Sequence, residues 1–320
     1  MIFASAMLVA MAVDWAVGWP GALYRRIGHP VTWIGALIRW LDRVLNREGD
    51  PDLMRRAMGV LAAFIVIGLA AAAGFVVQSQ LSGGWVAVLG IGVLAWPLVA
   101  TRSMHDHVAA VAKPLIAGDM KAARYAVSMI VGRDPTALDK AGVARAALES
   151  LAENTSDGII APLFWGAIFG LPGIAAYKAI NTLDSMIGHR TPRYNAFGQA
   201  SARIDDLVNL APARLTGVLF ALASTRPRAC LSVMWRDARH HRSPNAGWPE
   251  SALAAALNIR LSGPRVYHDH TADEPWLNAT AADPTPQDIV RGLSVYRRAM
   301  GLTAVLLAAI AGLAGGRGLL

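Results

Sequence analysis

Long apolar stretches alternate with polar stretches along this chain, and several apolar stretches match the thickness of a bilayer. Four of them are almost free of charged residues: 2–18, 57–77, 81–101 and 299–316. Since an α-helix needs roughly 20 apolar residues to cross a membrane, these four are predicted membrane spans. Only the polar residues 78–80 separate the second from the third, which predicts a transmembrane hairpin.

Two further apolar segments, 158–177 and 207–224, are interrupted by residues that break helices or carry charge. Glycine and proline recur in the first, and Pro212 and Arg214 interrupt the second. Broken helices at membrane depth line cavities, because their unpaired backbone groups need protein or water as partners. We therefore predict that both segments are partly inserted, as re-entrant or protein-buried helices around a cavity open to the cytoplasm.

The remaining segments are polar and are predicted to be loops that contain helices: 19–56, 102–157, 178–206 and 225–298. Arginines crowd the first, which places it in the cytoplasm by the positive-inside rule. Helix starts are predicted at Asp119, at Thr136 with Asp139 as a capping box, and at Thr285, which precedes a proline. Apolar residues at helical spacing also predict an amphipathic helix able to lie on the membrane: Val31, Ile34, Leu37, Ile38 and Leu41.

Composition agrees with this topology. The 320 residues are 54% hydrophobic and 16% charged, whereas soluble domains are typically about one quarter charged. The predicted fold class is all-α: a polytopic integral membrane protein, a single domain over 1–320, with cytoplasmic helical segments and Gly/Pro-broken or re-entrant helices. The net charge of +8 comes from scattered basic residues, which argues against nucleic acid as a partner. Cys230 is the only cysteine, which excludes an internal disulfide.

Two clusters of carboxylates and amides flank the 158–177 segment. In the first, Arg145, Glu149 and Glu153 recur at every fourth residue and share one helix face, with Asn154 and Asp157 following. Carboxylates at a membrane boundary are energetically expensive, and a chain that retains them generally uses them. The first cluster is therefore a candidate site.

The second cluster follows the segment. Its charged and amide residues recur at helical spacing on two stripes: Lys178, Asn181 and Asp184 or Ser185, and then Arg203 and Asp206, with Asp205 adjacent. Mg²⁺ typically takes one or two carboxylates plus substrate phosphates, and Lys or Arg stabilises a phosphoryl group in transfer. The pattern indicates phosphoryl-transfer chemistry. A salt-bridge network between two helices is the alternative.

A third polar group occurs where His240 and His241 precede a Ser-Pro-Asn-Ala-Gly turn that leads to Glu250. Neighbouring histidines on a helix cannot easily face one metal ion, so contact with substrate or phosphate is favoured. The sequence contains no GxxxxGK[ST], GxSxG, HExxH or CxxC motif. Any ATP binding is therefore not of the P-loop kind.

Six motifs, in order from about Asp14 to Leu257, carry a family resemblance: Asp14 with HPVTWIG, VGRDPTALD, ESLAENTSDGIIAPLF, YKAINTLDSMIGH, YNAFGQASARIDDLVNLAPARL and HRSPNAGWPESALAAAL. The chain resembles the CobD/CbiB family of cobalamin biosynthesis, the membrane-bound adenosylcobinamide-phosphate (cobinamide) synthases. The resemblance implies a carbon–nitrogen ligase that uses ATP. Its substrates would be the free propionate carboxyl of adenosylcobyric acid and (R)-1-amino-2-propanol or its O-phosphate.

The resemblance also implies Mg²⁺ and roles for the clustered residues. The implied metal ligands are Asp157, Asp184, Asp205 and Asp206, with Glu153 as a further candidate. The implied catalytic residues are Glu149, Glu153, Lys178, Asp184 and Arg203, with Glu149 a candidate base and Lys178 and Arg203 on phosphates. The residues implied to orient substrate are Asn154, Asn181, Ser185, His241, Ser243, Asn245 and Glu250. We expect the two carboxylate clusters to be the two halves of one site.

The expected location is the bacterial inner membrane, with the active site facing the cytoplasm. The expected partners are the bilayer and the two substrates, together with a second copy of the chain or other membrane enzymes of the cobalamin pathway. The alternative function is a membrane transporter or a regulatory membrane protein without ligase activity. A corrinoid carrier is disfavoured, because the D-x-H-x-x-G pattern of many such proteins is absent.

Overall fold

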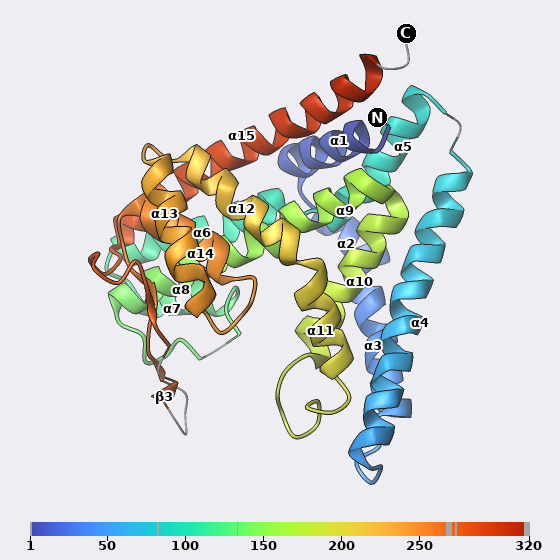
Figure 1. Cartoon of the computed structure of the whole chain (residues 1–320), viewed down its shortest axis with the longest axis horizontal. Coiled ribbons are helices and arrows are strands. Elements are labelled where there is room, and N and C mark those ends of the chain that lie inside the picture. Colours follow the sequence, from blue (N-terminus) through green and yellow to red (C-terminus); the bar gives the residue numbers. More distant parts are fainter. Residues whose placement is uncertain (1, 82, 133, 267–270, 273, 317–320) are drawn as a thin grey trace. The chain divides into compact units, whose positions relative to one another are not determined.

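The computed structural model of the chain (Figure 1) describes residues 2–81, 83–132, 134–266, 271–272 and 274–316. Within them the fold is helical apart from four two-residue strands, and bent helices are present. The all-α prediction is thus confirmed for these residues. Three predicted features reach outside them: the span 81–101 at Ser82, the VGRDPTALD motif at Arg133, and the polar segment 225–298 at 267–270 and 273.

The chain divides into two compact units, each assembled from separated parts of the sequence. Unit 1 comprises Met1–Ala100, Ala161–Asn209 and Leu306–Leu320. Unit 2 comprises Thr101–Ile160 and Leu210–Val305. The chain therefore enters unit 1 three times and unit 2 twice.

All regular secondary structure in the described part of unit 1 is helical. The end of α15 (Pro286–Gly316) also belongs to this unit. Its other elements are α1 (Ile2–Val17), α2 (Gly21–Ile27), α3 (Pro30–Leu45), α4 (Asp52–Ser79), α5 (Trp85–Ala95), the 3-10 turn η1 (Trp96–Leu98), α9 (Ala161–Phe169), α10 (Leu171–Ile187) and α11 (Gln199–Val208).

Unit 2 combines helices with two small antiparallel ribbons and includes the first part of α15. Its helices are α6 (Thr101–Ile116), α7 (Met120–Ser128), α8 (Lys140–Thr155), the π-helical turn η2 (Ser156–Ile160), α12 (Leu210–Ala223), α13 (Pro227–Asp237), the 3-10 turn η3 (Ala238–His240) and α14 (Gly247–Leu257). In the ribbons, β1 (Leu261–Ser262) pairs with β4 (Trp276–Leu277), and β2 (Arg265–Val266) pairs with β3 (Thr271–Ala272).

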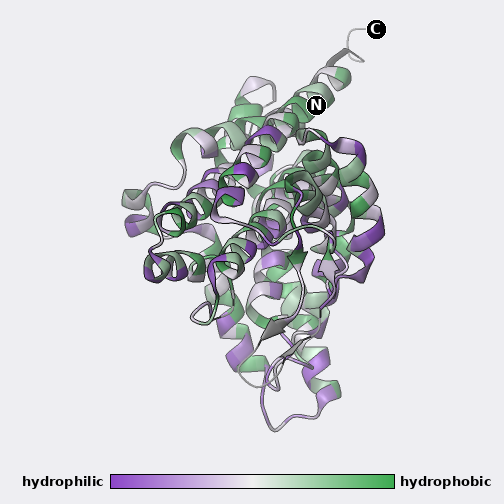
Figure 2. Cartoon of the chain, turned by 90° about the vertical axis from the view of Figure 1, so that its left-hand side faces the viewer, coloured by the Kyte–Doolittle hydropathy of each residue, from purple (hydrophilic) through white to green (hydrophobic). Residues whose placement is uncertain are grey.

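Several helices are long and apolar enough to cross a membrane, and Figure 2 shows hydrophobic residues along most of the helices. Within the described residues there are three such stretches: Asp52–Ser79, Trp85–Ile116 and Pro286–Leu313. Two bent pairs would raise the number to five: Ile2–Val17 with Gly21–Leu45, and Gln199–Val208 with Leu210–Ala223. The segment 158–177 overlaps none of them, because it is divided among η2, α9 and α10.

The core of unit 1 lies where α4 packs against α3 and α10, and α3 runs beside α4 in Figure 1. Ala62, Ala63 and Val66 form a buried stripe on α4, at the spacing of one helix face. They pack in one cluster with Leu183 of α10. Small side chains on α4 let the helix axes approach closely, which is the usual way that helices associate in lipid.

The amphipathic helix predicted at the membrane surface is present as α3, but its apolar face lies against protein. Ile38 and Leu41 are only 1% and 3% exposed, and both belong to the core shared with α4 and α10. The exposed side of the helix carries Trp33 and Trp40 instead. The prediction of the helix is confirmed and that of its apolar partner is wrong, because spacing alone does not say what covers an apolar stripe.

The predicted break in the 158–177 segment occurs between α9 and α10 at Gly170, whose φ is 70°. Residues with a side chain rarely adopt this left-handed conformation. The N–H of Leu171, at the start of α10, donates to the side-chain oxygen of Gln78 at 2.8 Å. A polar residue at the end of one predicted span therefore satisfies a donor that the break in another segment leaves unpaired.

Side-chain caps set the helix starts in unit 2. Asp119 caps α7, and α15 begins at Pro286 directly after Thr285, so both predicted starts are confirmed. At α8 the cap is Asp139, whose carboxylate accepts from a backbone N–H at 2.7 Å. The predicted capping box that begins at Thr136 is therefore wrong, because the helix starts three residues later.

Two glycines of α4 offer a test of the core packing. A Cβ at Gly59 would lie 1.9 Å from the carbonyl oxygen of Phe197, whereas Gly68 has nothing within 4 Å. We predict that Gly59→Ala lowers the melting temperature of the purified protein, since overpacking costs about 1–3 kcal/mol. Gly68→Ala should leave it unchanged or raise it slightly, because alanine favours helix. Thermal unfolding followed by circular dichroism measures both, and equal melting temperatures would contradict the packing.

Cysteine labelling tests the predicted topology. Thr191 is exposed between α10 and α11, while the native Cys230 is buried and should not react. We predict that Thr191→Cys in intact cells resists a membrane-impermeant maleimide and reacts after permeabilisation, because the predicted topology places this loop on the cytoplasmic side. Efficient labelling from outside would overturn this orientation, and labelling of the unsubstituted protein controls for Cys230.

Candidate functional site

Asp184 and Asp206 form a pair of carboxylates in unit 1. Asp184 lies on the last turn of α10 and Asp206 on α11, close enough for their charges to interact. Three basic groups act on the pair electrostatically: His189 on Asp184, and Arg190 and Arg203 on Asp206. Two carboxylates beside several cationic groups match the needs of a phosphate ligand that carries a divalent cation.

The surroundings of Asp184 disfavour its charged form. Burial raises the pKa of this carboxyl above its ordinary value, His189 partly offsets that effect, and the negative charge of Asp206 adds to it. An added positive charge would relieve both the burial and the repulsion. The geometry is therefore one in which a bound cation would lower the pKa of Asp184.

Asp205 lies in a different environment from the adjacent Asp206. It is 9% exposed, and its carboxylate accepts a hydrogen bond from the side-chain amide of Asn209 at 2.9 Å. The hydroxyl of Tyr177 donates to the oxygen of the same Asn209 side chain at 2.8 Å. These hydrogen bonds connect α10 to α11 through Asn209, whereas the adjacent Asp206 lies within electrostatic reach of Arg190 and Arg203.

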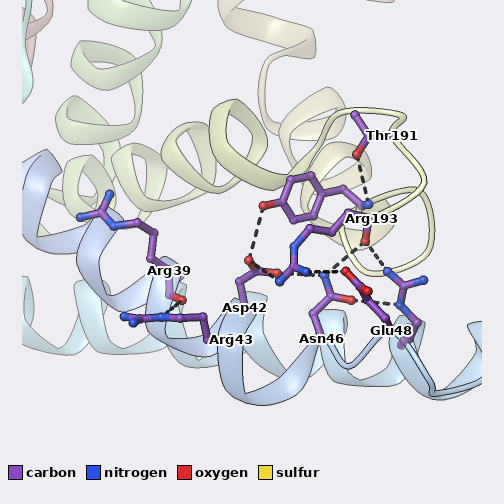
Figure 3. A network of polar contacts seen from close by, with 9 residues as sticks. Arg39, Asp42, Arg43, Asn46, Glu48, Thr191 and Arg193 are labelled. Atoms are coloured by element: carbon purple, nitrogen blue, oxygen red, sulfur yellow. Dashed lines mark hydrogen bonds and ion pairs between the residues drawn. The ribbon is translucent and has the colours of Figure 1, made fainter.

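A polar network holds the loop between α10 and α11, as Figure 3 shows. Arg193 in the loop donates to the carboxylate of Asp42 on α3 at 3.0 Å. Its carbonyl oxygen accepts from Asn46 and from Arg55, and Arg55 also donates to the Asn46 side chain at 3.0 Å. Tyr194 adds a hydroxyl contact to Asp42 at 3.4 Å. The loop that separates Asp184 from Asp206 is thereby anchored to α3 and α4.

Close backbone packing completes this anchor. A Cβ at Gly198 would lie 1.6 Å from the carbonyl oxygen of Ile187, and one at Gly188 would lie 2.0 Å from the carboxylate of Asp184. Both positions therefore require glycine. They allow the loop to return directly onto the end of α10, which brings Asp206 back beside Asp184.

The other residues predicted on α10 lie as the spacing indicates. Lys178 is half-buried and lies near enough to His29 to act on its ring electrostatically. The Ser185 hydroxyl donates to the carbonyl oxygen of Asn181 at 2.8 Å, so these two predicted residues are one helical turn apart. Arg203 on α11 is exposed. Unit 1 thus holds Lys178, Asn181, Asp184, Ser185, Arg203, Asp205 and Asp206 on two successive helices.

In unit 2, α8 carries the first predicted cluster into the π-helical turn η2. Glu149 is buried, and its carboxylate accepts a hydrogen bond from the backbone N–H of Ser262 in β1 at 2.8 Å. Glu153 and Asn154 are exposed, and Asp157 within η2 is half-buried. π-helical turns are rare and occur preferentially at functional sites, which strengthens the case for the sequence around Asp157.

The Ser-Pro-Asn-Ala-Gly turn of unit 2 brings the third predicted group together. The Nε2 atom of His241 lies 3.8 Å from the carboxylate of Glu250 on α14, and both side chains are buried. The backbone N–H of Ser243 donates to Nδ1 of His241 at 3.1 Å. Nδ1 accepts this hydrogen bond in the neutral tautomer that carries its proton on Nε2, the nitrogen nearer Glu250.

This turn also packs closely onto α14. A Cβ at Gly247 would lie 2.5 Å from the carbonyl oxygen of Ala238 and 2.6 Å from Cβ of His241. The Ser243 hydroxyl accepts from the backbone N–H groups of Asn245 and Ala246 at 3.3 and 3.1 Å. The four predicted residues His241, Ser243, Asn245 and Glu250 thus form one rigid group.

Comparison with known proteins places the chain in a family. The family model described as CobD/Cbib protein matches residues 7–296. The chain belongs to the CobD/CbiB family. It is 67% identical over 307 residues to a protein of Rhodobacter capsulatus named "Cobalamin biosynthesis protein CobD", covering 96% of this chain and 97% of that protein. Proteins of the same name from Brucella suis and a Sinorhizobium species are 46% and 44% identical, over 94% and 95% of this chain and 95% and 97% of theirs. No solved structure matches the chain.

The predicted site residues of this CobD/CbiB protein are distributed over both units. Glu149, Glu153, Asn154 and Asp157 share unit 2 with the His241–Glu250 group, and α8 contacts α14 within that unit. Lys178 to Asp206 belong to unit 1. The structure therefore groups the first cluster with the third, which spacing along the sequence did not indicate. That the two carboxylate clusters form one site stays a prediction.

The residues of unit 1 fit Mg²⁺ only in part. In the part of the chain that the structure describes, no group of three or more His, Cys, Asp or Glu could hold a metal ion by itself. The Asp184–Asp206 pair nevertheless fits a Mg²⁺ that takes one or two carboxylates and completes its shell with substrate phosphates and water. A cation there would depend on the phosphates of a bound substrate.

Several residues that hold the candidate site of this family member were not predicted from its sequence. Asp42, Asn46, Arg55 and Arg193 anchor the 188–198 loop, but partners about 150 residues apart leave no periodic signal in a single sequence. Arg214 was different: it is a cation within an apolar segment, which is by itself a sign of function. In the sequence it was interpreted only as an interruption of the segment.

Asp184 provides a pH-dependent test. Because its pKa is raised in the folded protein, the native state holds this proton to higher pH than the unfolded chain does, and ionisation then destabilises the fold. We predict that Asp184→Asn melts at a higher temperature than wild type at pH 7 to 8, without nucleotide or Mg²⁺. The difference should disappear as the pH falls toward the ordinary value of 3.8.

Asp52→Asn is the matched control, since Asp52 is an exposed carboxylate of the same unit at the start of α4. Removing a negative charge from the first turn of a helix should not stabilise the protein. An Asp184→Asn variant that melts no higher than wild type at pH 8 would contradict the electrostatic account.

Proposed function

We propose that this protein acts in cobalamin biosynthesis as an ATP-dependent amide ligase. It would join the propionate carboxyl of adenosylcobyric acid to (R)-1-amino-2-propanol or to its O-phosphate. Family membership and the name of its relatives, "Cobalamin biosynthesis protein CobD", support the pathway. The reaction itself is supported by the chemistry of the clustered residues.

The observation that carries the proposal is the Asp184–Asp206 pair with its basic neighbours. The pair is disfavoured while both groups are ionised and no cation is bound, because burial and mutual repulsion oppose ionisation at Asp184. Such an arrangement favours the binding of a cation. Arg190 and Arg203 beside Asp206 supply donors for phosphate oxygens, so the surroundings suit a nucleotide phosphate with Mg²⁺.

In the proposed reaction the carboxylate oxygen of the corrinoid attacks the γ-phosphorus of ATP. A P–O bond to that oxygen forms, the bond to the β-phosphate oxygen breaks, and ADP leaves. The amine then attacks the acyl carbon, inorganic phosphate departs, and one proton of the amine passes to a carboxylate or to water. Carbon–nitrogen bond formation is thus driven by the loss of phosphate.

We assign the phosphate steps to unit 1. Asp184, Asp205 and Asp206 would hold Mg²⁺, and Lys178 and Arg203 would contact phosphates. Mg²⁺, when bound, supplies positive charge that neutralises the phosphate oxygens. The Tyr177–Asn209–Asp205 chain and the Arg193 network would keep these carboxylates in place while the substrates exchange.

We assign substrate contacts to both units. Asn181 and Ser185 in unit 1, and Asn154, His241, Ser243, Asn245 and Glu250 in unit 2, would orient the corrinoid acid and the amine. Glu149 and Glu153 would serve acid–base chemistry, and Asp157 would add a further metal ligand. Among these, Glu149 already accepts a backbone hydrogen bond from Ser262, which fixes one of its oxygens.

We further propose that the protein works in the bacterial inner membrane with this chemistry on the cytoplasmic side, where ATP is present. The apolar helices support insertion in a membrane. The proposed associations, with a second copy of the chain or with other membrane enzymes of the pathway, would keep the corrinoid close to the next enzyme.

The test is an assay on the purified full-length protein in detergent. ADP should form only when adenosylcobyric acid and aminopropanol or its phosphate are both present, and the amide product should appear in equal amount. Asp184→Ala and Asp205→Ala should each lower kcat roughly 100-fold or more, since they remove electrostatic stabilisation of the transferring phosphoryl group. Asp52→Ala, on the exposed start of α4, should retain activity.

Two results would overturn the proposal. Undiminished activity in either of the two variants would exclude the assigned carboxylates. A transporter or regulatory protein would instead bind the corrinoid without forming ADP, and mass spectrometry of the corrinoid would show no added aminopropanol.

A further inference from the structure

Arg214 is a cation on α12, a helix that is otherwise apolar apart from a threonine. The side chain is half-buried. Its Nη1 donates to the carbonyl oxygen of Leu210 at 2.7 Å and to the side-chain oxygen of Asn245 at 3.4 Å. The guanidinium also lies over the ring of Trp248, 4.3 Å from its centroid. Three different contacts therefore hold the group in one orientation.

Close helix packing explains why Arg214 reaches the turn that precedes α14. A Cβ at Gly217 would lie 2.5 Å from the sulfur of Met234 and 3.0 Å from the carbonyl oxygen of Trp248. The absence of a side chain at Gly217 lets α12 approach α14 at Trp248. Arg214 lies one helical turn earlier on α12, so its guanidinium meets Trp248 and Asn245.

The guanidinium is not neutralised by any of the residues that the structure describes. Its contacts are a carbonyl, an amide oxygen and an aromatic ring, and no carboxylate lies within ion-pair distance. The carboxylate of Glu250, nearby in sequence to Asn245, faces His241 instead. A partly buried charge that lacks a counter-charge is costly, and a specific anion would remove that cost.

Other arginines of unit 2 differ from Arg214 in this respect. Arg145 and Arg260 also lie over an aromatic ring, that of Trp276, but both form ion pairs with Asp283. Arg236 pairs with the adjacent Asp237 at 2.5 Å. Arg145 and Arg260 thus each have a carboxylate beside the stacked guanidinium, whereas Arg214 has none among the described residues.

The hydrogen bonds of Arg214 also leave one edge of the guanidinium available. Both of its hydrogen bonds start from Nη1, which carries two hydrogens, so Nε–H and the Nη2 hydrogens have no acceptor among the described residues. These are the parallel donors with which arginine binds two oxygens of one carboxylate or phosphate. The ring of Trp248 fixes the plane in which they point.

We propose that Arg214, stacked on Trp248 and held by Asn245, is the residue that binds an anionic oxygen group of a substrate. The ligand class is a phosphate or a carboxylate that presents two oxygens to the Nε–Nη2 edge. The source of this anion rests on the proposed function. That reaction offers three anionic groups: the phosphates of ATP, the phosphate of the amine and the carboxylate of the corrinoid.

Direct binding tests the site without requiring the reaction. Binding of inorganic phosphate and of ATP to the purified full-length protein in detergent would be measured by calorimetry, for wild type, Arg214→Gln and Arg214→Lys. Loss of a charge-assisted bidentate contact should weaken binding of at least one probe about 10- to 100-fold in Arg214→Gln. Arg214→Lys should recover part of it, since the charge remains and the fork is lost.

Arg226→Gln is the matched control. Arg226 is an exposed arginine just after α12 and donates to Asn258 at 3.1 Å, so its replacement removes the same charge from the same unit. It should leave binding of both probes unchanged. Circular dichroism and melting temperature would show whether each variant is folded.

Kinetics identify the source of the anion. In Arg214→Gln, KM should rise about 10- to 100-fold for one substrate only: ATP, aminopropanol phosphate or adenosylcobyric acid. A larger KM for aminopropanol phosphate with an unchanged KM for aminopropanol would assign the amine's phosphate. An unchanged KM for all substrates, together with unchanged probe binding, would overturn the proposal.

These results separate this proposal from the proposed function. If wild type forms no amide but phosphate or ATP binding depends on Arg214, the anion site stands and the ligase reaction fails. If wild type forms the amide while a folded Arg214→Gln matches it in every KM and in probe binding, the reaction stands and the site fails.

Discussion

Polar groups in a largely apolar chain need partners, and the placement of those partners determines much of this structure. An unsatisfied backbone or charged group costs several kcal/mol away from water. Gln78 supplies an acceptor for the start of α10, and Arg55 with Asn46 satisfies the backbone of the 188–198 loop. Each of these side chains forms a hydrogen bond with a backbone group at a helix break or in a loop far away in the sequence.

The same requirement separates structural from functional polar residues. Arg193 and Asp42 satisfy one another, and so do Arg260 and Asp283, which accounts for their presence without any ligand. Asp184 is poorly compensated, because burial and the nearby charge of Asp206 both oppose its ionisation. Structures generally tolerate such destabilising groups where function needs them, which is consistent with Asp184 as a candidate site residue.

Local signals in the sequence were sufficient for much of the fold. The caps at Asp119 and before Pro286, the break at Gly170 and the helix α3 all follow from residues close to one another in the chain. The partner of an apolar stripe is not local information, which is why the face of α3 was misassigned. Likewise, nothing near Asp42 indicates that it binds a loop about 150 residues further on.

The candidate site, too, could be predicted only where the signal in the sequence is local. Helical spacing correctly grouped Lys178, Asn181 and Ser185 along α10, and the turn before α14 gathers His241 with Glu250. Spacing could not show that α8 shares its unit with α14, because that depends on where the chain returns after the intervening segment Ala161–Asn209 of unit 1. A charged residue in an apolar segment, such as Arg214, was readable from the sequence but needed Trp248 and Asn245 to acquire a role.

The alternation of the chain between the two units has a consequence for the synthesis of the protein itself. Unit 1 receives α4 early, yet α10, which covers the buried stripe of α4, is made about 100 residues later. During synthesis the stripe with Ala62, Ala63 and Val66 therefore lacks its contacts with α10 until that helix is made. Small, apolar residues suit this interval, since lipid can cover them without loss until α10 arrives. The order of translation thus adds a constraint on the residues of α4 to the one that the finished fold imposes.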